Sequence, residues 1–331
     1  MKTEISPYQL HYAGESHRAS RRGALLKVLF PEFGAGYADC HPWPELGDLS
    51  LEEHLQTLID GSPTALIEQS LKFARLDAEA RQQKRHLFTG LVVPNSHYLV
   101  ADPSVHFKPN LLPMLDFSLL ATQNPLYKIK MGLDFDHELA LLKSWRKHGF
   151  LKSAKCFLDF NGKISENQFC EFLHKADELL DGIEFFEDPF PYDPERWEKV
   201  RKEFGIALAC DHESMEGLSH PNSCDFLVIK PATQEIDPFL SNQRGHRHLI
   251  ITSLMDHPIG QLCAAYVAAN TAKTYRESIK SCGLLSHHTY EATPFSARFG
   301  QEGMRLIPPL SGYGWGFNDL LEELPWKPLI S

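Results

Sequence analysis

The stretch AKCFLDFNGKISENQFCEFLHKADELLDGIEFFEDPF, residues 154–190, holds two short apolar runs separated by an amphipathic segment. The apolar runs are typical of buried strands, and the segment between them carries apolar residues at helical spacing. Each run ends on a carboxylate, Asp159 in the first and Glu187 in the second. Strand, helix and strand in this order predict two parallel strands joined by a crossover helix.

The same unit repeats on both sides of this stretch. Candidate strands are YLVAD (98–102), LYKIKMG (126–132), AKCFLDFN (154–161), GIEFFEDPF (182–190), IALACD (206–211), DFLVIKP (225–231), HLIITSL (248–254) and a weaker GLLSH (283–287). Amphipathic segments at 137–149, 166–180, 194–204 and 260–273 predict helices between several of them. An open Rossmann-like sheet gives a similar pattern, but its Gly-rich first turn follows no strand here. We therefore expect an α/β fold, a (β/α)8-type barrel, over residues 96–305.

Residues 1–95 do not follow this rhythm. ALLKVLF (24–30) predicts a strand, and 34–48 reads as a Gly- and Pro-rich loop. Two helices are expected next, the first beginning after Asp48 as its N-cap. These features predict a small α+β domain, and we expect the Pro- and Gly-rich segment 306–331 to pack back on it.

Composition narrows the class of protein. The net charge is −10, so a nucleic-acid binder with its basic face is disfavoured. Seven cysteines without a C-x-x-C pair indicate reduced thiols in a cytoplasmic protein. No stretch approaches the ~18 consecutive apolar residues of a membrane span, and the N-terminus lacks the apolar core of a secretory signal.

Polar residues stand near the C-terminal ends of six successive candidate strands. They are Lys130, Asp159, Glu187, Asp211, Lys230 and Ser253. In a (β/α)8 barrel these strand ends meet at one face, where the active site lies. Carboxylates suit a hard divalent cation, and lysines suit proton transfer, so the set predicts a metal-assisted acid/base site.

Residues two apart on a strand share a face, which adds candidates to this set. Lys128 points the same way as Lys130, and repulsion between the two ammonium groups is expected to lower the pKa of each. Asn161 shares a face with Asp159, and Glu213 with Asp211, so either Asp211 or Glu213 could be the third metal ligand. Each signal has a plain alternative: exposed lysines on an edge strand, a D-x-N-G turn, a solvated carboxylate or a snorkelling lysine. The ordered combination on five successive strands decides against these alternatives.

This ordered set resembles the enolase superfamily, specifically its muconate-lactonizing-enzyme subgroup. That subgroup carries K-x-K on the second barrel strand, carboxylates on the third, fourth and fifth, and a lysine on the sixth. The resemblance implies a modified TIM barrel with an N-terminal capping domain, formed by residues 1–95 and completed by 306–331. It implies the following roles: Lys130 as the main acid/base with Lys128 beside it, Lys230 as the opposing lysine, Mg²⁺ (or Mn²⁺) on Asp159, Glu187 and Asp211, and Asn161 nearby.

Within the subgroup the chain is most similar to the o-succinylbenzoate synthases. SRRGALLKVLFPEFGAGYADCHPWP (20–44) resembles their first strand and capping loop, and TSLMDHPIGQLCAAYVAA (252–269) their seventh strand. The resemblance makes Ser253 a receiver of a substrate carboxylate. Capping-loop candidates for a succinyl arm are Arg22 and Trp43, with Arg21 and His17. The chain departs from the family at Asp211-His212-Glu213-Ser214, where D-E-S is usual, and at Asp39, where Glu is common.

The resemblance implies a lyase: a Mg²⁺-dependent syn dehydration of 2-succinyl-6-hydroxy-2,4-cyclohexadiene-1-carboxylate to o-succinylbenzoate through an enediolate, in menaquinone biosynthesis. Three other reactions fit the same scaffold, namely N-succinylamino acid racemisation, dipeptide epimerisation and muconate cycloisomerisation. A non-catalytic binding barrel is a more distant alternative. The expected partner is a small anionic carboxylate, with no nucleic acid and no membrane, and the sequence does not indicate an oligomeric state.

Overall fold

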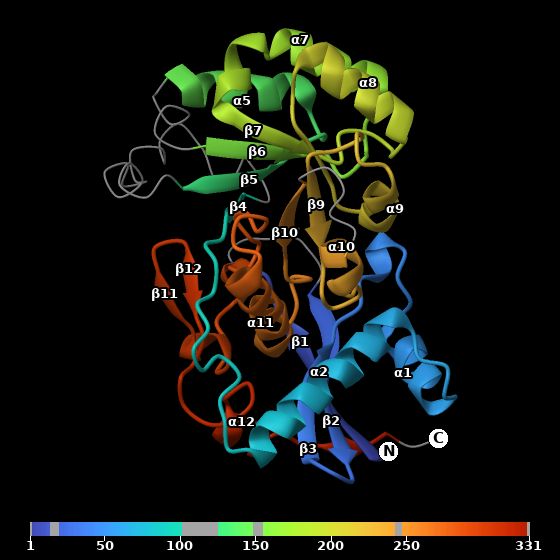
Figure 1. Ribbon diagram of the computed structural model, residues 1–331, viewed down its shortest axis with the longest axis vertical. Coiled ribbons are helices and arrows are strands. Elements are labelled where there is room, and N and C mark those ends of the chain that lie inside the picture. Colours follow the sequence, from blue (N-terminus) through green and yellow to red (C-terminus); the bar gives the residue numbers. More distant parts are fainter. Residues whose placement is uncertain (1, 14–19, 101–124, 148–154, 242–246, 330–331) are drawn as a thin grey trace.

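A computed structural model describes residues 2–13, 20–100, 125–147, 155–241 and 247–329 (Figure 1). The described chain contains a four-stranded antiparallel sheet in the order β13-β1-β2-β3 and a seven-stranded parallel sheet in the order β10-β9-β8-β7-β6-β5-β4. The first sheet lies with α1 and α2 at one end of the molecule, and the second sheet forms the other part (Figure 1). No helix in the described ranges is long and apolar enough to cross a membrane.

The antiparallel sheet joins the two ends of the chain. Its strands are β1 (Lys2–Leu10), β2 (Arg21–Phe30), β3 (Gly34–Cys40) and β13 (Lys327–Pro328), and β13 pairs with β1. The prediction of a loop over 34–48 was wrong in its first half, because residues 34–40 form β3. Two glycines in this stretch weaken its strand signal, and pairing with β2 supplies what local preference lacks.

Two helices cover this sheet, α1 (Leu51–Ile59) and α2 (Ala65–Gln82). The N-cap of α1 is Ser50, which forms a capping box with Glu53, so the prediction of Asp48 was wrong. The Asp48 carboxylate instead bonds the ring of His54 and the backbone N–H of Trp43. Helix α2 packs directly on β3: a Cβ on Gly36 would lie 1.8 Å from the Ala74 carbonyl oxygen, so only glycine fits this approach.

The parallel strands follow one another around a ring. They are β4 (Tyr98–Val100), β5 (Leu126–Lys130), β6 (Lys155–Asp159), β7 (Ile183–Glu187), β8 (Leu208–Cys210), β9 (Phe226–Ile229) and β10 (His248–Ile251). The extended segment 279–283 closes the ring through single parallel bridges, to Leu249 and Thr252 on the β10 side and to Ser96 on the β4 side. This closure confirms the barrel and excludes an open Rossmann-like sheet.

The weak eighth strand was misplaced. It was expected at 283–287, and the bridging residues are 279–283, without a regular ladder among the described residues. Backbone hydrogen bonds nevertheless hold this segment on both sides, from Cys282 N to Asn95 O at 2.8 Å and from Gly283 N to Ile251 O at 2.9 Å. A short irregular segment can therefore complete the barrel, although it carries no periodic signal in the sequence.

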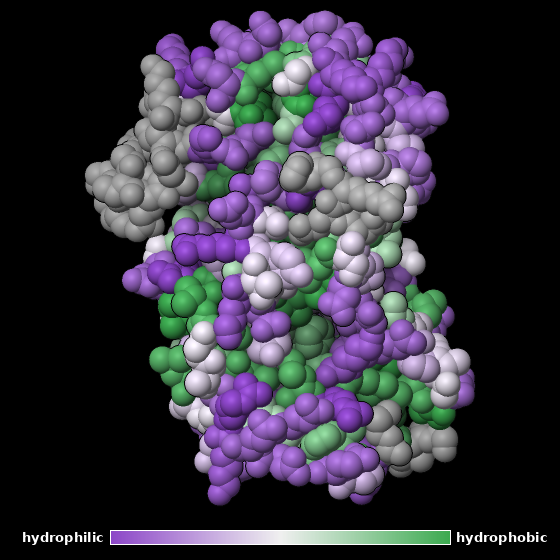
Figure 2. Space-filling view, viewed as in Figure 1, coloured by the Kyte–Doolittle hydropathy of each residue, from purple (hydrophilic) through white to green (hydrophobic). Residues whose placement is uncertain are grey.

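Helices flank the barrel strands and the remaining elements lie toward the C-terminus. They are α5 (Phe135–Lys147), α7 (Glu166–Lys175), α8 (Pro194–Phe204), α9 (Ser214–Ser219), α10 (Asp237–Ser241), α11 (Pro258–Thr274), α12 (Asn318–Glu322) and the hairpin β11 (Gly300–Glu302) with β12 (Arg305–Ile307). Hydrophilic residues dominate the outer surface over α7 and α8 (Figure 2). Of α8 only Trp197 and Val200 are buried, so an amphipathic helix covers the strands as its spacing predicts.

Candidate active site

The barrel interior is built in layers, and the upper layer carries the chemistry. A compact apolar cluster at the lower level consists of one residue from each of five strands, namely Phe157, Phe185, Ala209, Val228 and Ile250. Two residues further along the chain, at the last residue of a strand or the one directly after it, stand Asp159, Glu187, Asp211, Lys230 and Thr252. Strand alternation therefore brings together residues that lie up to 93 positions apart in the sequence (159 and 252).

On one side of the barrel, two lysines of β5 contact the carboxylates of β6 and β7. The Lys128 ammonium lies 2.8 Å from Asp159 Oδ2 and 2.5 Å from Glu187 Oε1. Lys130 Nζ lies 2.5 Å from Asp159 Oδ2 and donates to Asn161 Oδ1 at 2.9 Å. Both predicted pairs, K-x-K and D-x-N, thus face one centre.

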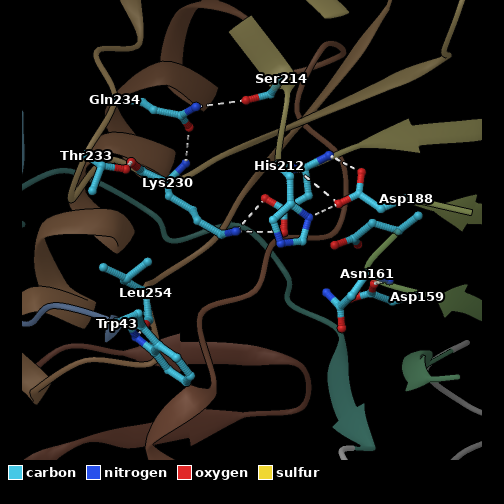
Figure 3. A network of polar contacts seen from close by, with 12 residues as sticks. Trp43, Asp159, Asn161, Asp188, His212, Ser214, Lys230, Thr233, Gln234 and Leu254 are labelled. Carbon is cyan, nitrogen blue, oxygen red and sulfur yellow. Dashed lines mark hydrogen bonds and ion pairs between the residues drawn. The ribbon is translucent and has the colours of Figure 1, made fainter. Parts of the chain in front are cut away.

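Lys230 approaches from the other side of the barrel. Its ammonium lies 2.6 Å from Asp211 Oδ1, and Figure 3 shows it across the site from Asp159 and Asn161. Strands β5 and β9 stand four positions apart in a ring of seven strands and one closing segment, which places Lys130 and Lys230 opposite each other. The Lys230 backbone N–H donates to Gln234 Oε1 at 2.8 Å, and Gln234 in turn bonds Ser214.

The electrostatics of Lys128 contradict the sequence prediction. Burial disfavours its charged form, but Asp159, Glu187 and Asp211 outweigh burial and raise the pKa of Lys128. We expected repulsion from Lys130 to lower this pKa. The expectation was wrong because three carboxylates surround the ammonium, and their combined attraction exceeds one repulsion.

The carboxylates respond to the same cluster in different directions. Burial raises the pKa of Glu187 well above its usual range, and the neighbouring Asp159 raises it further. Burial opposes ionisation of Asp159 and Asp211 too, but Lys128 and Lys130 lower the pKa of Asp159, and Lys230 and Lys128 lower that of Asp211. Of the three carboxylates, only Glu187 has a raised pKa, so its ionised form would gain most from an additional positive charge.

Asp211 and Glu213, the two candidates for a third metal ligand, differ in burial. Asp211 is buried, lines the cavity and pairs with Lys230, whereas Glu213 is exposed at the start of α9. The two residues share a face only if the strand continues, and β8 ends at Cys210. The alternation of side chains that would put Asp211 and Glu213 on one face therefore does not extend to Glu213.

Asp188 is a site residue that sequence reasoning missed. Its carboxylate accepts hydrogen bonds from the backbone N–H groups of Asp211 (2.9 Å) and His212 (3.1 Å), and it bonds the His212 ring (Figure 3). It lies at a positive φ of 40°, which turns it away from Glu187. The signal available was its position directly after Glu187, but nothing in the sequence indicated that it would hold the end of β8.

Two groups of side chains in this part of the barrel could provide ligands for a divalent cation. Asp188, Asp211 and His212 offer ligand atoms within 4.8 Å of one another, but both Asp188 oxygens already accept N–H donors. Asp159, Glu187 and Asp211 are 0%, 1% and 6% exposed and carry the anionic oxygens that hard cations prefer. Burial and the neighbouring Asp159 destabilise the charge of Glu187, and a divalent cation among the three carboxylates would offset this, so this second set fits a divalent cation.

A cavity of about 520 Å³ opens above these residues. Both candidate acid/base lysines line it, and so do Asn161, Ser253 and Trp43, as predicted from sequence. The Ser253 hydroxyl lies 2.7 Å from that of Ser286, which also lines the cavity. The cavity therefore joins the strand-end residues to the capping loop.

The arginine on the capping side differs from the expected one. Arg22 does not line the cavity: its side chain is 65% exposed and pairs with Glu52. Arg21 lines the cavity, lies 3.7 Å over the Trp43 ring and donates to Tyr12 Oη at 3.0 Å. Alternation along β2 could not distinguish the two, because both faces of the strand are covered over Gly23–Leu26. His17 lies outside the described residues.

The comparisons with known proteins agree with this architecture. Residues 3–80 match the family model of the N-terminal domain of O-succinylbenzoate synthase. The chain is 36% identical over 336 residues to the o-succinylbenzoate synthase of Bdellovibrio bacteriovorus, covering 99% of both chains.

Solved structures match the fold. A mandelate racemase/muconate lactonizing enzyme from Roseiflexus sp. matches with a TM-score of 0.75 at 16% identity, over 95% of this chain and 96% of that one. The L-Ala-D/L-Glu epimerase of Bacillus subtilis matches with a TM-score of 0.74 at 16% identity, over 96% and 98%.

Fold and site together define a capped barrel with the fold of the mandelate racemase and muconate lactonizing enzymes. Identity over nearly the full length is more specific than this likeness of fold. The chain belongs to the o-succinylbenzoate synthase family.

Proposed function

We propose that this protein is an o-succinylbenzoate synthase, a hydro-lyase that dehydrates 2-succinyl-6-hydroxy-2,4-cyclohexadiene-1-carboxylate by syn elimination. The observation that carries the proposal is the pairing of two cavity-facing lysines, Lys130 and Lys230, across three buried carboxylates. Identity of 36% to a named synthase supports this reaction over others on the scaffold.

We assign the base to Lys130 and a supporting role to Lys128. The Lys130 side chain is 30% exposed and faces the cavity, whereas Lys128 is 10% exposed and held between two carboxylates. Lys130 can therefore reach the α-proton of a bound substrate and then return that proton to the departing hydroxide on the same face. Lys128 fixes Asp159 and Glu187.

Lys230 is assigned to the opposite face of the substrate ring. Its raised pKa, which Asp211 produces against the effect of burial, keeps it charged. A charged ammonium over the ring contributes a cation–π contact and moves no proton in a syn elimination. Bound by Asp159, Glu187 and Asp211, Mg²⁺ (or Mn²⁺) supplies Lewis-acid stabilisation of negative charge on the substrate carboxylate.

The first test separates the chemical roles from metal binding. Lys130→Ala and Lys230→Ala are each expected to lower kcat by at least ~10³-fold, while Mg²⁺ still binds by calorimetry, because the three carboxylates remain. Lys163→Ala is the matched control, since this lysine also lines the cavity but is exposed. Near-normal turnover by Lys130→Ala, or removal of the metal with EDTA without loss of activity, would contradict the assignment.

A second function on the same residues is racemisation, in which both lysines move protons. The structure of Bacillus subtilis named above is an epimerase, so the fold accommodates that chemistry. Solvent deuterium should enter N-succinylamino acids with inversion of the α-carbon only if Lys230 also moves a proton, because exchange by Lys130 alone keeps the configuration. We expect dehydration of the cyclohexadiene to be much faster, and the reverse order of rates would favour racemisation.

We place the dehydration in menaquinone biosynthesis in the cytoplasm. We also propose two domains for the chain: a capping domain of residues 1–95 and 306–331, and a barrel of residues 96–305.

A further inference from the structure

Two buried carboxyl groups meet where the capping sheet docks on the barrel. Asp39 lies near the end of β3 and is 8% exposed, and Asp256 lies in the loop after β10 and is 3% exposed. Oδ2 of Asp39 and Oδ2 of Asp256 lie 2.6 Å and 2.5 Å from the position that a Cβ on Gly260 would occupy. Both carboxyl oxygens therefore lie within 2.6 Å of one point beside Gly260, a space that any larger side chain there would share with them.

Positive charge to balance this pair is missing among the described residues. Neither carboxylate forms an ion pair there with lysine, arginine or histidine. The titratable groups that face the pair come from several segments: Tyr8 of β1, Cys40 of β3 with His41 after it, His257 as the N-cap of α11 with Cys263 inside that helix, and Tyr290. Burial lowers the pKa of both His41 and His257 to about 3, so neither ring carries charge near neutral pH.

The hydrogen bonds assign different roles to the two carboxyl groups. Asp39 accepts from Tyr8 Oη at 2.7 Å and from the backbone N–H of His257 at 3.0 Å, at the N-terminus of α11. These donors stabilise a carboxylate. Asp256 leaves Oδ1 without a hydrogen-bond partner. Two like charges this close in a buried site cannot both ionise at low cost, as in carboxylate pairs that share one proton.

We propose that Asp39 and Asp256 share a single proton, and that this pair is the joint that positions the capping loop over the barrel. The joint connects two segments that line the cavity: Trp43 follows Asp39 by four residues, and Leu254 precedes Asp256 by two. Trp43 Nε1 donates to the Leu254 carbonyl at 2.7 Å, so the two segments are also bonded directly. Asp39 and Asp256 are positioning residues here, because neither lines the cavity itself.

Ionisation of the joint should cost stability as pH rises. Burial raises the pKa of Asp39 well above its usual range and that of Asp256 to about 7. The folded state therefore holds a proton that the unfolded state releases near pH 4, and stability falls as pH rises from about 4 through about 7. An uncharged amide in place of Asp256 removes this loss and can still donate to Asp39.

The test compares Asp256→Asn with the wild-type protein in thermal unfolding at pH 5 and pH 8.5. The melting temperature of the variant minus that of the wild type should grow by about 3–6 °C over this interval. Asp136→Asn, whose side chain is 92% exposed, is the matched control and should show a constant difference. A difference for Asp256→Asn that stays constant or shrinks with pH overturns the proposal.

A second measurement keeps the proposal testable if the variant folds poorly. The infrared difference spectrum of the wild type between pH 5 and pH 8.5 should show the carbonyl stretch of a buried protonated carboxylic acid that the spectrum of Asp39→Asn lacks. Its absence at pH 5 overturns the shared proton. These readouts need no substrate, so they stand or fall separately from the proposed dehydration. If the dehydration holds, KM should rise with pH more steeply in the wild type than in Asp256→Asn, with kcat ratios unchanged.

Discussion

Two lysines that are indistinguishable in sequence have different surroundings on β5. Both line the cavity, but Lys128 lies between Asp159 and Glu187 and is 10% exposed, whereas Lys130 bonds Asp159 and Asn161 and is 30% exposed. Because Lys130 follows Lys128 by two residues on the same strand, its ammonium lies one layer higher in the barrel, nearer the proposed substrate. Charge environment at the residue scale is therefore set by depth in the barrel, which residue type does not reveal.

Neighbouring arginines provide a test at this scale. Arg21→Met is expected to lower kcat/KM for the proposed substrate by about 10–100-fold, since it removes a cationic hydrogen-bond donor worth roughly 1.5–3 kcal/mol from the cavity wall. Arg22→Met, with its exposed side chain, is the matched control and should stay within about twofold. Steady-state kinetics of both variants decide the assignment, and equal losses would show that Arg21 has no special role.

At the scale of elements, the chain is built from units whose local preferences vary in strength. Helix α2 and strand β3 illustrate the contrast, because α2 has a helical pattern visible in sequence while β3 was taken for a loop. Gly36 reads as a flexible residue, but in β3 it allows the backbone to approach Ala74. Gly36, which the packing of β3 on α2 requires, therefore also weakens the strand signal in the sequence.

The start of α1 offers a test of element boundaries. Ser50→Ala should lower the free energy of unfolding by about 1 kcal/mol, because it removes the oxygen that accepts from the Glu53 N–H. Ser62→Ala is the control, since this serine is exposed outside a helix. Denaturant unfolding measures both variants, and equal stabilities would mean that the capping box contributes nothing.

At the scale of the whole molecule, the interior holds several neutral histidines. Burial lowers the pKa of His41, His97 and His257 to about 3, the first and last at the joint between cap and barrel and His97 next to Lys128. Between pH 3 and about 6.5 these histidines bind protons in the unfolded chain but stay neutral in the folded chain. Stability from these residues is therefore present above pH 6.5 and is lost as pH falls.

Acid sensitivity follows from this burial. Each of these histidines should remove up to about 1.4 kcal/mol of stability per pH unit below about 6.5. Denaturant unfolding of His97→Gln at pH 5 and pH 7.5 should show a smaller loss at pH 5 than the wild type. His137→Gln changes an exposed histidine of α5 and should follow the wild type. Parallel losses in all three proteins would contradict the prediction.

The site residues that could be predicted from the sequence are those at or directly after the end of a barrel strand, where side chains still alternate between the two faces. Asp159, Glu187, Asp211 and Lys230 lie at the ends of short apolar runs, and two-residue periodicity identified their inward direction before any coordinates. Asp188 was not assigned, because its role depends on a positive φ after β7, and Arg21 could not be preferred to Arg22, because β2 is covered on both faces. Periodicity carries no information where the backbone leaves the strand or where both faces are buried.

By itself the sequence determined the order of barrel strands, the apolar layer and the residue types above it, because hydrophobic periodicity is a local property of the chain. Only the tertiary structure decided which groups meet. The carboxylates around Lys128 raise the pKa that sequence reasoning expected to fall, and the end of strand β8 at Cys210 leaves Glu213 exposed. It also brought Asp39 beside Asp256, residues separated by 217 positions. Charge interactions depend on distance and burial, and both arise only when distant segments pack together.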